Sequence, residues 1–282
     1  MPSPQLRADL ARDGVFNTRD LGGLLTSNGQ KIAPRKLLRA DALQRVQLSG
    51  PALREFGIVR VLDLRDDLER EKSGEIQVDG IEVEHHPVID PAFAWHSEEE
   101  SEFADLLFLR YCEIFTSFGP RFLGAVNSIA EVLDESNSSP SGAVAYHCAI
   151  GKDRTGLLTA LLLSILGVED QVIASDYAKS SAATAVQVQW LWSFSLPGGE
   201  TTDRDLELGV WSARPETMLR TLGWVDAEFG GAEQYMIEQG LGADVISTLR
   251  ESLLLSKTWS TNYRLRRLHV ENRRYRTRFL AT

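Results

Sequence analysis

The sequence contains only two cysteines, Cys112 and Cys148, in 282 residues. Two cysteines cannot form the disulfide framework of a small secreted protein, so we expect the chain to fold in a reducing compartment. The amino-terminal residues also lack the apolar stretch of a secretory signal, although export by a route without a cleavable signal stays open. The prediction is therefore a cytoplasmic protein.

Long hydrophobic runs and an excess of positive charge are missing as well. The most apolar segment, residues 156–168, is too short to span a bilayer, so no transmembrane segment is predicted. The formal net charge is −10, whereas a sequence-independent grip on nucleic acid needs a basic surface. We expect no nucleic-acid partner. No spacing of His, Cys, Asp or Glu typical of metal ligands is visible, so neither a metal nor another cofactor is expected.

The chain has ample material for a core, with 43% hydrophobic residues. Short apolar runs predict strands at 58–64, 81–88 and 143–146, and they alternate with segments that predict helices at 49–56, 66–72, 103–118, 120–133 and 155–166. This alternation is typical of an α/β protein whose mainly parallel central sheet is flanked by helices. After residue 169 the pattern is almost entirely helical, with runs at 214–229, 232–239 and 243–255, which predicts a helical C-terminal cap.

The composition changes after residue 256. Residues 257–282 carry eight lysines and arginines against one acidic residue, Glu271. We therefore expect one domain, with its helical cap, over residues 1–256 and a basic tail over 257–282. Such charge runs are usually solvated or docked on an acidic body, and a weak contact with anionic lipid is the alternative.

The ten residues from His147 to Gly156, HCAIGKDRTG, lie between a predicted strand and an apolar helix. A loop in that position points successive backbone N–H groups at one spot, and the positive end of the following helix reinforces them. Such a loop binds a tetrahedral oxyanion, and the same field favours the thiolate of a cysteine at its base. The predicted phosphate-binding residues are Ala149, Ile150, Gly151, Lys152, Asp153 and Arg154.

These residue types predict a reaction at phosphorus. Cys148 is expected to attack in line, giving a phosphocysteine that water then hydrolyses, while the planar fork of Arg154 stabilises the transition state. Thr155, at the helix start, is expected to donate a hydrogen bond to the sulfur. His147 is expected to orient the loop rather than to transfer protons. Cys112 lies on an apolar helix face, which predicts core packing.

The loop resembles the signature of the cysteine-dependent protein tyrosine phosphatases, in which His-Cys is followed by five residues, Arg and Ser or Thr. More narrowly, HCAIGKDRTG resembles the atypical, mostly microbial branch whose loop carries GKDRTG. The stretches FNTRDLGG and VLDLRDDLE are similar to two further segments of that branch. The resemblance covers roughly residues 15–255. It implies a tyrosine-phosphatase-like catalytic domain that acts on phosphotyrosine and often on phosphoserine, phosphothreonine and phosphoinositides.

The acid that protonates the leaving group has two candidates. The Trp-Pro-Asp tripeptide that supplies it in most tyrosine phosphatases is absent. Asp153 lies inside the loop, at the position that the atypical branch is proposed to use. Asp90 follows the second predicted strand, where the family places another acidic residue. We favour Asp153, and a salt bridge that only shapes the loop is the alternative role for it.

Lys152 bears on the class of substrate. A second cation beside Arg154 suits a substrate with more than one phosphate, such as an inositol lipid headgroup, whereas a lysine that only neutralises Asp153 or faces solvent does not. We predict a phosphorylated protein or phosphoinositide substrate, ahead of strict phosphotyrosine specificity. Two other classes of protein fit the sequence less well. A sulfurtransferase typically lacks the Arg-Thr ending of the loop. A non-catalytic phosphate-binding module has usually lost the Cys or the Arg.

Overall fold

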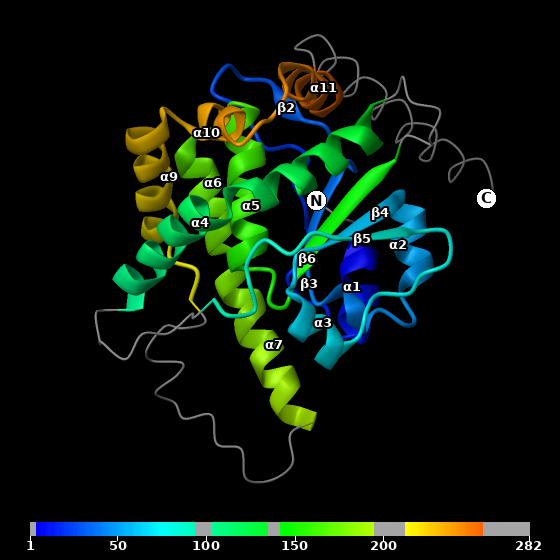
Figure 1. Ribbon diagram of the computed structural model, residues 1–282. Coiled ribbons are helices and arrows are strands. Elements are labelled where there is room, and N and C mark those ends of the chain that lie inside the picture. The colour runs from blue at the N-terminus through cyan, green and yellow to red at the C-terminus, as the bar shows by residue number, and fades with distance from the viewer. Residues whose placement is uncertain (1–3, 94–102, 135–141, 195–211, 256–282) are drawn as a thin grey trace, which may run out of the picture.

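The structure is a computed structural model that describes residues 4–93, 103–134, 142–194 and 212–255. A five-stranded sheet in the order β1-β3-β6-β4-β5 lies at its centre (Figure 1). The strands are β1 (Arg19–Asp20), β3 (Leu37–Asp41), β6 (Ala143–Cys148), β4 (Ile58–Asp63) and β5 (Glu82–His85). All neighbouring pairs are parallel except β1 with β3. The predicted α/β class with a mainly parallel sheet is confirmed.

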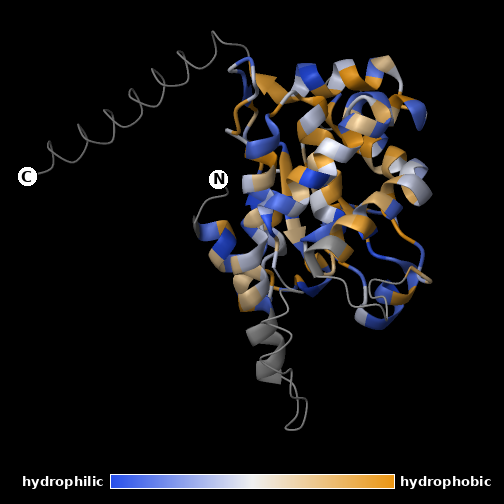
Figure 2. Cartoon of the chain, turned by 90° about the vertical axis from the view of Figure 1, so that its left-hand side faces the viewer, coloured by the Kyte–Doolittle hydropathy of each residue, from blue (hydrophilic) through white to orange (hydrophobic). Residues whose placement is uncertain are grey.

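The central strand β6 is buried at every position, because helices cover both faces of the sheet. On one face, α1 (Pro4–Arg12), the single turn η1 (Leu43–Arg45) and α2 (Gly50–Phe56) enclose the smaller of two apolar clusters. The larger cluster lies on the other face, under α4 (Phe103–Leu133), α5 (Asp153–Ile165) and the later helices. In Figure 2 the helices carry both blue and orange segments, as expected for elements with one buried face.

The predicted helical cap is also confirmed. It consists of α6 (Asp170–Ala178), α7 (Ser180–Phe194), α9 (Pro215–Phe229), α10 (Ala232–Glu238) and α11 (Ala243–Leu253). The sequence predicted that the last helix would reach Leu255, but Leu254–Leu255 form the short strand β7, which pairs with β2 (Lys31–Ile32). This pair ties the end of the cap to the amino-terminal part of the chain.

Two further local predictions differ from the structure. The segments 103–118 and 120–133 form one helix, α4, with the exposed Pro120 inside it. Phe115 before the proline and Phe122 after it are both buried in the same cluster, and this packing outweighs the missing N–H of the proline. Ser49 precedes α2 as predicted but does not cap it, because its hydroxyl donates to Asp13 at 2.5 Å.

Parallel strands bring their carboxyl ends to one edge of the sheet. At that edge Asp41 of β3 pairs with Cys148 of β6, and Asp63 of β4 pairs with His147. This is where ligands bind in open α/β sheets. The helix α3 (Asp67–Ser73) begins just beyond the end of β4 and reaches the same edge.

The predicted basic tail, residues 257–282, lies outside the described residues. Within the described ranges, the helices are too short or too polar for one of them to cross a membrane.

Candidate active site

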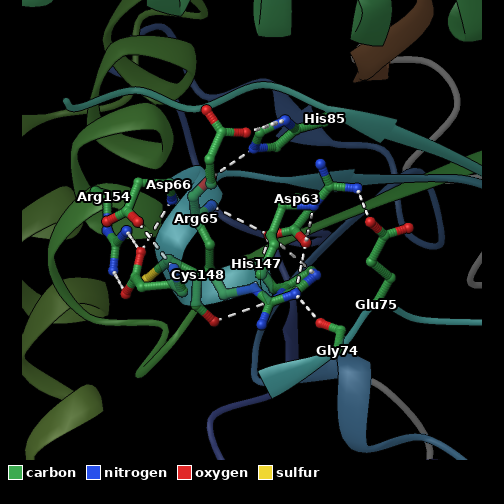
Figure 3. Close-up of polar contacts among 12 residues, drawn as sticks. Asp63, Arg65, Asp66, Gly74, Glu75, His85, His147, Cys148 and Arg154 are labelled. Atoms are coloured by element: carbon green, nitrogen blue, oxygen red, sulfur yellow. Dashed lines mark hydrogen bonds and ion pairs between the residues drawn. The ribbon is translucent and has the colours of Figure 1, made fainter. Parts of the chain in front are cut away.

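The loop of residues 149–152 connects the end of β6 to the start of α5. Cys148 closes the strand and is 2% exposed, and the N–H of Gly151 donates to its Sγ at 3.2 Å. Figure 3 shows Cys148 beside Arg154, with His147 and Asp63 to the right of them. The predicted strand–loop–helix arrangement of HCAIGKDRTG is therefore present.

Three consecutive carbonyls of this loop are held by side chains from three separate parts of the chain. The contacts are Gln187 Nε2 to Ala149 O at 3.1 Å, Asn17 Nδ2 to Ile150 O at 3.1 Å, and Arg39 Nη2 to Gly151 O at 2.8 Å. In a trans peptide the carbonyl and the next N–H point in opposite directions. The N–H groups that follow these carbonyls therefore point away from the three donors, and the N–H of Gly151 does point at the sulfur. The loop thus turns its carbonyls to these donors and the N–H of Gly151 to the sulfur, which is how a backbone nest that binds anions is arranged.

Gly151 is needed for the path of the loop. Its φ is +72°, and a Cβ at this position would lie 2.6 Å from the carbonyl oxygen of Ala40. No L-residue fits this position without moving β3 or the loop.

Asp41 fixes the segment that supplies Asn17. Its carboxylate accepts the backbone N–H of Phe16 at 3.0 Å and of Asn17 at 2.7 Å. Burial raises the pKa of Asp41 to about 6, and the two backbone donors oppose that rise. Asp41 is also the neighbour of Cys148 across the sheet. The strand β3 therefore fixes the position of Asn17 relative to the loop that follows Cys148.

Arg154 lies in the first turn of α5 and is 5% exposed. Its Nη2 donates to Glu69 Oε1 at 2.7 Å, and its Nη1 contacts Glu69 Oε2. Glu69 is itself fixed, because it and Asp66 form a capping box at the start of α3, with both bonds at 2.9 Å. Arg154 Nε is buried and has no hydrogen-bond partner among the described residues. Glu69 therefore holds the guanidinium while Nε remains available as a donor.

Electrostatics keeps this pair charged. Burial alone would raise the pKa of Glu69, but the hydrogen bond and the charge of Arg154 outweigh it and lower the pKa to about 2. Burial would likewise lower the pKa of Arg154, yet Glu69 and the nearby Cys148 raise it above its ordinary value. Both side chains are therefore ionised at neutral pH.

His147 is buried and neutral. Burial lowers its pKa to about 4, although the Asp63 carboxylate opposes that shift. Its Nδ1 lies 3.2 Å from the carbonyl oxygen of Cys148, and its Nε2 lies 3.7 Å from Asp63. Asp63 is paired with Arg65 at 2.7 Å (Figure 3). These contacts agree with the orienting role expected for His147.

The predicted acid Asp153 faces two other polar side chains. Tyr111 on α4 donates to its Oδ1 at 2.6 Å, and Lys152 Nζ lies 3.4 Å from the same oxygen. Burial, together with the charge of Asp153, raises the pKa of Tyr111 well above its usual value, so the phenol stays a donor. The hydroxyl of Tyr177 is 2.7 Å from that of Tyr111 and extends the network.

Lys152 does not face solvent, which was one of the alternatives for it. Its side chain is only 4% exposed, and Nζ is 3.5 Å from the carbonyl oxygen of Ser212 as well as close to Asp153. The side chain is therefore held in place at the loop.

Three other residues singled out from the sequence either lack the expected contact or make their contacts outside the loop. Thr155 is buried, but its Oγ1 makes no hydrogen bond within the described part of the chain, so the predicted bond to the sulfur is not seen. Asp90 is 48% exposed, and its carboxylate accepts the N–H of Ala92 and pairs with Arg121 at 3.4 Å. Cys112 is partly buried on α4, and burial raises its pKa to about 11.

Several residues of the site were missed in the sequence. Gln187 lies on a helix that carried no motif, and Tyr111 sits in an ordinary apolar helix. Glu69 had a signal, because the capping box Asp66-x-x-Glu69 directly follows the strand β4. Asn17 had one too, because it lies within the quoted stretch FNTRDLGG.

Comparisons with known proteins agree with this geometry. A model described as the tyrosine phosphatase family matches residues 10–255. The chain is 28% identical over 274 residues to the triple specificity protein phosphatase PtpB of Mycobacterium tuberculosis, which covers 86% of this chain and 97% of that protein. It is 29% identical over 196 residues to a putative tyrosine-protein phosphatase of Cupriavidus necator, over 65% of this chain and 67% of that one. A solved structure of Pseudomonas aeruginosa TpbA in complex with phosphotyrosine is 14% identical and covers 76% of this chain and 91% of its own, but the TM-score of 0.33 is too low to carry weight.

The Glu69→Gln variant tests the ion pair through the pH dependence of stability. The pKa of Glu69 drops from 4.5 to about 2 on folding, so its stabilisation is complete above pH 4.5 and is lost as the pH falls through about 2. We expect the wild type to have a Tm at least about 2 °C above that of the variant near neutral pH. That difference should shrink as the pH falls below 4.5.

Thermal unfolding over a series of pH values measures this difference. Glu71→Gln, an exposed change on the same helix, is the matched control and should show no such trend. A gap between wild type and Glu69→Gln that stays constant down to about pH 3 would show that the carboxylate is not the stabilising group.

Proposed function

The chain belongs to the tyrosine phosphatase family and is a phosphoric monoester hydrolase of the protein-tyrosine-phosphatase type, and from that premise we propose that it acts on phosphotyrosine, phosphoserine, phosphothreonine and phosphoinositides. The observation that carries the proposal is the loop itself, in which Cys148 Sγ lies under amide donors beside a fixed Arg154. The words "triple specificity" in the name of the M. tuberculosis relative support a range wider than phosphotyrosine.

We propose that Cys148 is the nucleophile. The phosphoryl oxygens bind to the loop N–H groups and to Arg154, whose Nε is available as a buried donor. The thiolate attacks phosphorus, the bond from phosphorus to the ester oxygen breaks, and the leaving oxygen takes a proton from an acid. Water then attacks the phosphocysteine, the P–S bond breaks, and inorganic phosphate and the thiolate are released. The same acid residue, now a carboxylate, accepts the proton of that water.

Asp153 is our choice for the acid. It sits at the start of α5 next to Arg154, and Tyr111 fixes its carboxyl at 2.6 Å. Asp90 is the second candidate, and its exposure and pairing with Arg121 count against it.

Lys152 supports activity on phosphoinositides. A cation that is held beside the loop, rather than solvated, offers a fixed site for a second phosphate. Its pairing with Asp153 is the competing explanation, and in that case the enzyme would be a strict phosphotyrosine phosphatase. A non-catalytic phosphate-binding module is disfavoured because both Cys148 and Arg154 are present and lie side by side at the loop.

We further propose that residues 1–256 form the catalytic domain and that 257–282 form a separate basic tail. A weak contact of that tail with anionic lipid would bring the enzyme near a phosphoinositide. We assign the protein to the cytoplasm because both of its cysteines are free thiols.

Phosphate release from a panel of substrates tests the function. The panel contains phosphotyrosine, phosphoserine and phosphothreonine peptides and singly and multiply phosphorylated inositides. We expect turnover of each class by the wild type and none by Cys148→Ser, which should still bind phosphotyrosine peptide, because only the nucleophile is lost. Release by the serine variant at the wild-type rate would remove Cys148 from the reaction. Turnover of phosphotyrosine alone would leave strict specificity as the correct assignment.

The Asp153→Asn variant tests the acid. An alkyl phosphate has a poor leaving group that needs a proton, so we expect its kcat to fall by about 10²–10⁴-fold. An aryl phosphate with an acidic phenol, such as 4-nitrophenyl phosphate, should lose far less. Steady-state kinetics on both substrates measures the contrast, and Asp90→Asn serves as the comparison. Equal losses on the two substrates would assign Asp153 a purely electrostatic role.

The Lys152→Ala variant tests the substrate class. We expect kcat/KM for a multiply phosphorylated inositide to fall about tenfold more than for a small aryl phosphate, because only the inositide has a second phosphate to bind. Lys31→Ala removes an equal charge from an exposed position on β2 and is the control. Parallel losses on both substrates would reject the role of Lys152 in phosphoinositide recognition.

A further inference from the structure

A cavity lies beside the amino-terminal segment that holds the loop. It has a volume of about 610 Å³, and it is lined by residues of the segment 16–24, of α1 and of the stretch from α6 to α7. None of residues 147–155 lines it. Its size is in the range that holds a small organic ligand.

The charges that line this cavity are mainly positive. Arg7, Arg19 and Lys179 face two carboxylates, Asp20 and Asp176. The lining thus has three cations against two anions, although the whole chain has a net charge of −10.

Both carboxylates are already engaged. Asp20 accepts the backbone N–H of Gly22 at 2.8 Å and of Arg35 at 3.0 Å. Asp176 pairs with Arg19 and with Arg39, each at 2.9 Å. The positive charges of the cavity are therefore only partly compensated.

Two polar groups at this cavity are incompletely compensated. Thr18 is buried and lines the cavity, and its Oγ1 has no hydrogen-bond partner among the described residues. Burial is the main cause that lowers the pKa of Arg19 to about 10, and repulsion from Arg39 adds to it, although the Asp176 carboxylate opposes the shift. A bound anion would favour the charged form of Arg19.

The remaining wall is apolar. Phe16 and Leu24 line one part of it, and Ala182 and Ala183 of α7 line another. Small side chains on the helix leave room for a hydrophobic body next to the cationic end. This combination of a few polar groups with an apolar wall is the usual composition of a small-molecule site.

We propose that this cavity binds a small organic anion, one carboxylate or phosphate group on an apolar body. The anionic group binds at the part of the lining that carries Arg7 and Arg19. The apolar body packs against Phe16, Leu24 and the alanines of α7.

Such a ligand acts on the side chains that hold the catalytic loop. Asn17 lines the cavity and donates to Ile150 O, and Arg19 donates to Asn17 Oδ1 at 2.5 Å. Through Asp176, Arg19 is also linked to Arg39, which donates to Gly151 O. Occupation of the cavity therefore changes the affinity of the loop for an oxyanion, and by linkage the oxyanion changes the affinity of the cavity by the same factor.

Binding of octanoate measured by calorimetry tests the site. Octanoate has the proposed chemistry and is not a phosphate ester, and the titration is made on protein whose loop is saturated with vanadate. We expect binding at a ratio of one to one, and weaker binding of the neutral octan-1-ol. Arg7→Glu and Ala183→Leu should each weaken octanoate binding by about tenfold or more, because they reverse a lining charge and fill the apolar part.

The matched controls lie on the same helices. Arg12→Glu makes the same change of net charge on α1, and Ala185→Leu makes the same change of size on α7, and neither residue lines the cavity. Both should bind octanoate as the wild type does. Equal weakening by the controls, or no binding at about 10 mM octanoate, would overturn the proposal.

The coupling is measured by repeating the titration without vanadate. The ratio of the two octanoate dissociation constants should differ from one and should equal the ratio for vanadate measured with and without octanoate. A ratio of one would refute the link to the loop. If vanadate itself fails to bind, the assignment of the phosphate loop is wrong, whereas the octanoate titration of the Arg7 and Ala183 variants still decides on the cavity.

Discussion

The site depends on how the carbonyls of the loop after β6 are held. Gln187, Asn17 and Arg39 bind three successive carbonyl oxygens on one side, so the intervening N–H groups face the other side, where Cys148 lies. A short loop without these donors would be free to turn its carbonyls toward the sulfur, and an anion would then be repelled. The three donors come from the amino-terminal segment, from β3 and from α7, so the anion site exists only in the folded chain.

The buried arginines around the loop are each held by a buried or partly buried carboxylate. Glu69 fixes Arg154, Asp176 joins Arg19 to Arg39, and Asp63 holds Arg65. Each arginine is therefore held in a fixed direction by its carboxylate.

Much of the architecture could be predicted because it is encoded locally. The alternation of strands and helices gave the parallel α/β sheet, and HCAIGKDRTG lies between β6 and α5 as expected. Predictions that depended on distant contacts were less successful. Pro120 did not divide α4, since Phe115 and Phe122 pack in one cluster, and the hydroxyl of Thr155 does not bond the sulfur. Glu69 was missed because a capping box explains it without reference to a loop that lies 85 positions away in the sequence.

The sequence by itself determined the order of the loop residues, and with it the proposed nucleophile, the arginine beside it and the family, because these residues are neighbours in one short strand–loop–helix segment. The tertiary structure decided the rest: which carbonyls are tied back, which carboxylate holds Arg154, and that Lys152 is packed beside Asp153 and not in water. Contacts between side chains of separate elements form because two apolar clusters pack those elements onto the sheet. A local sequence pattern does not predict such contacts.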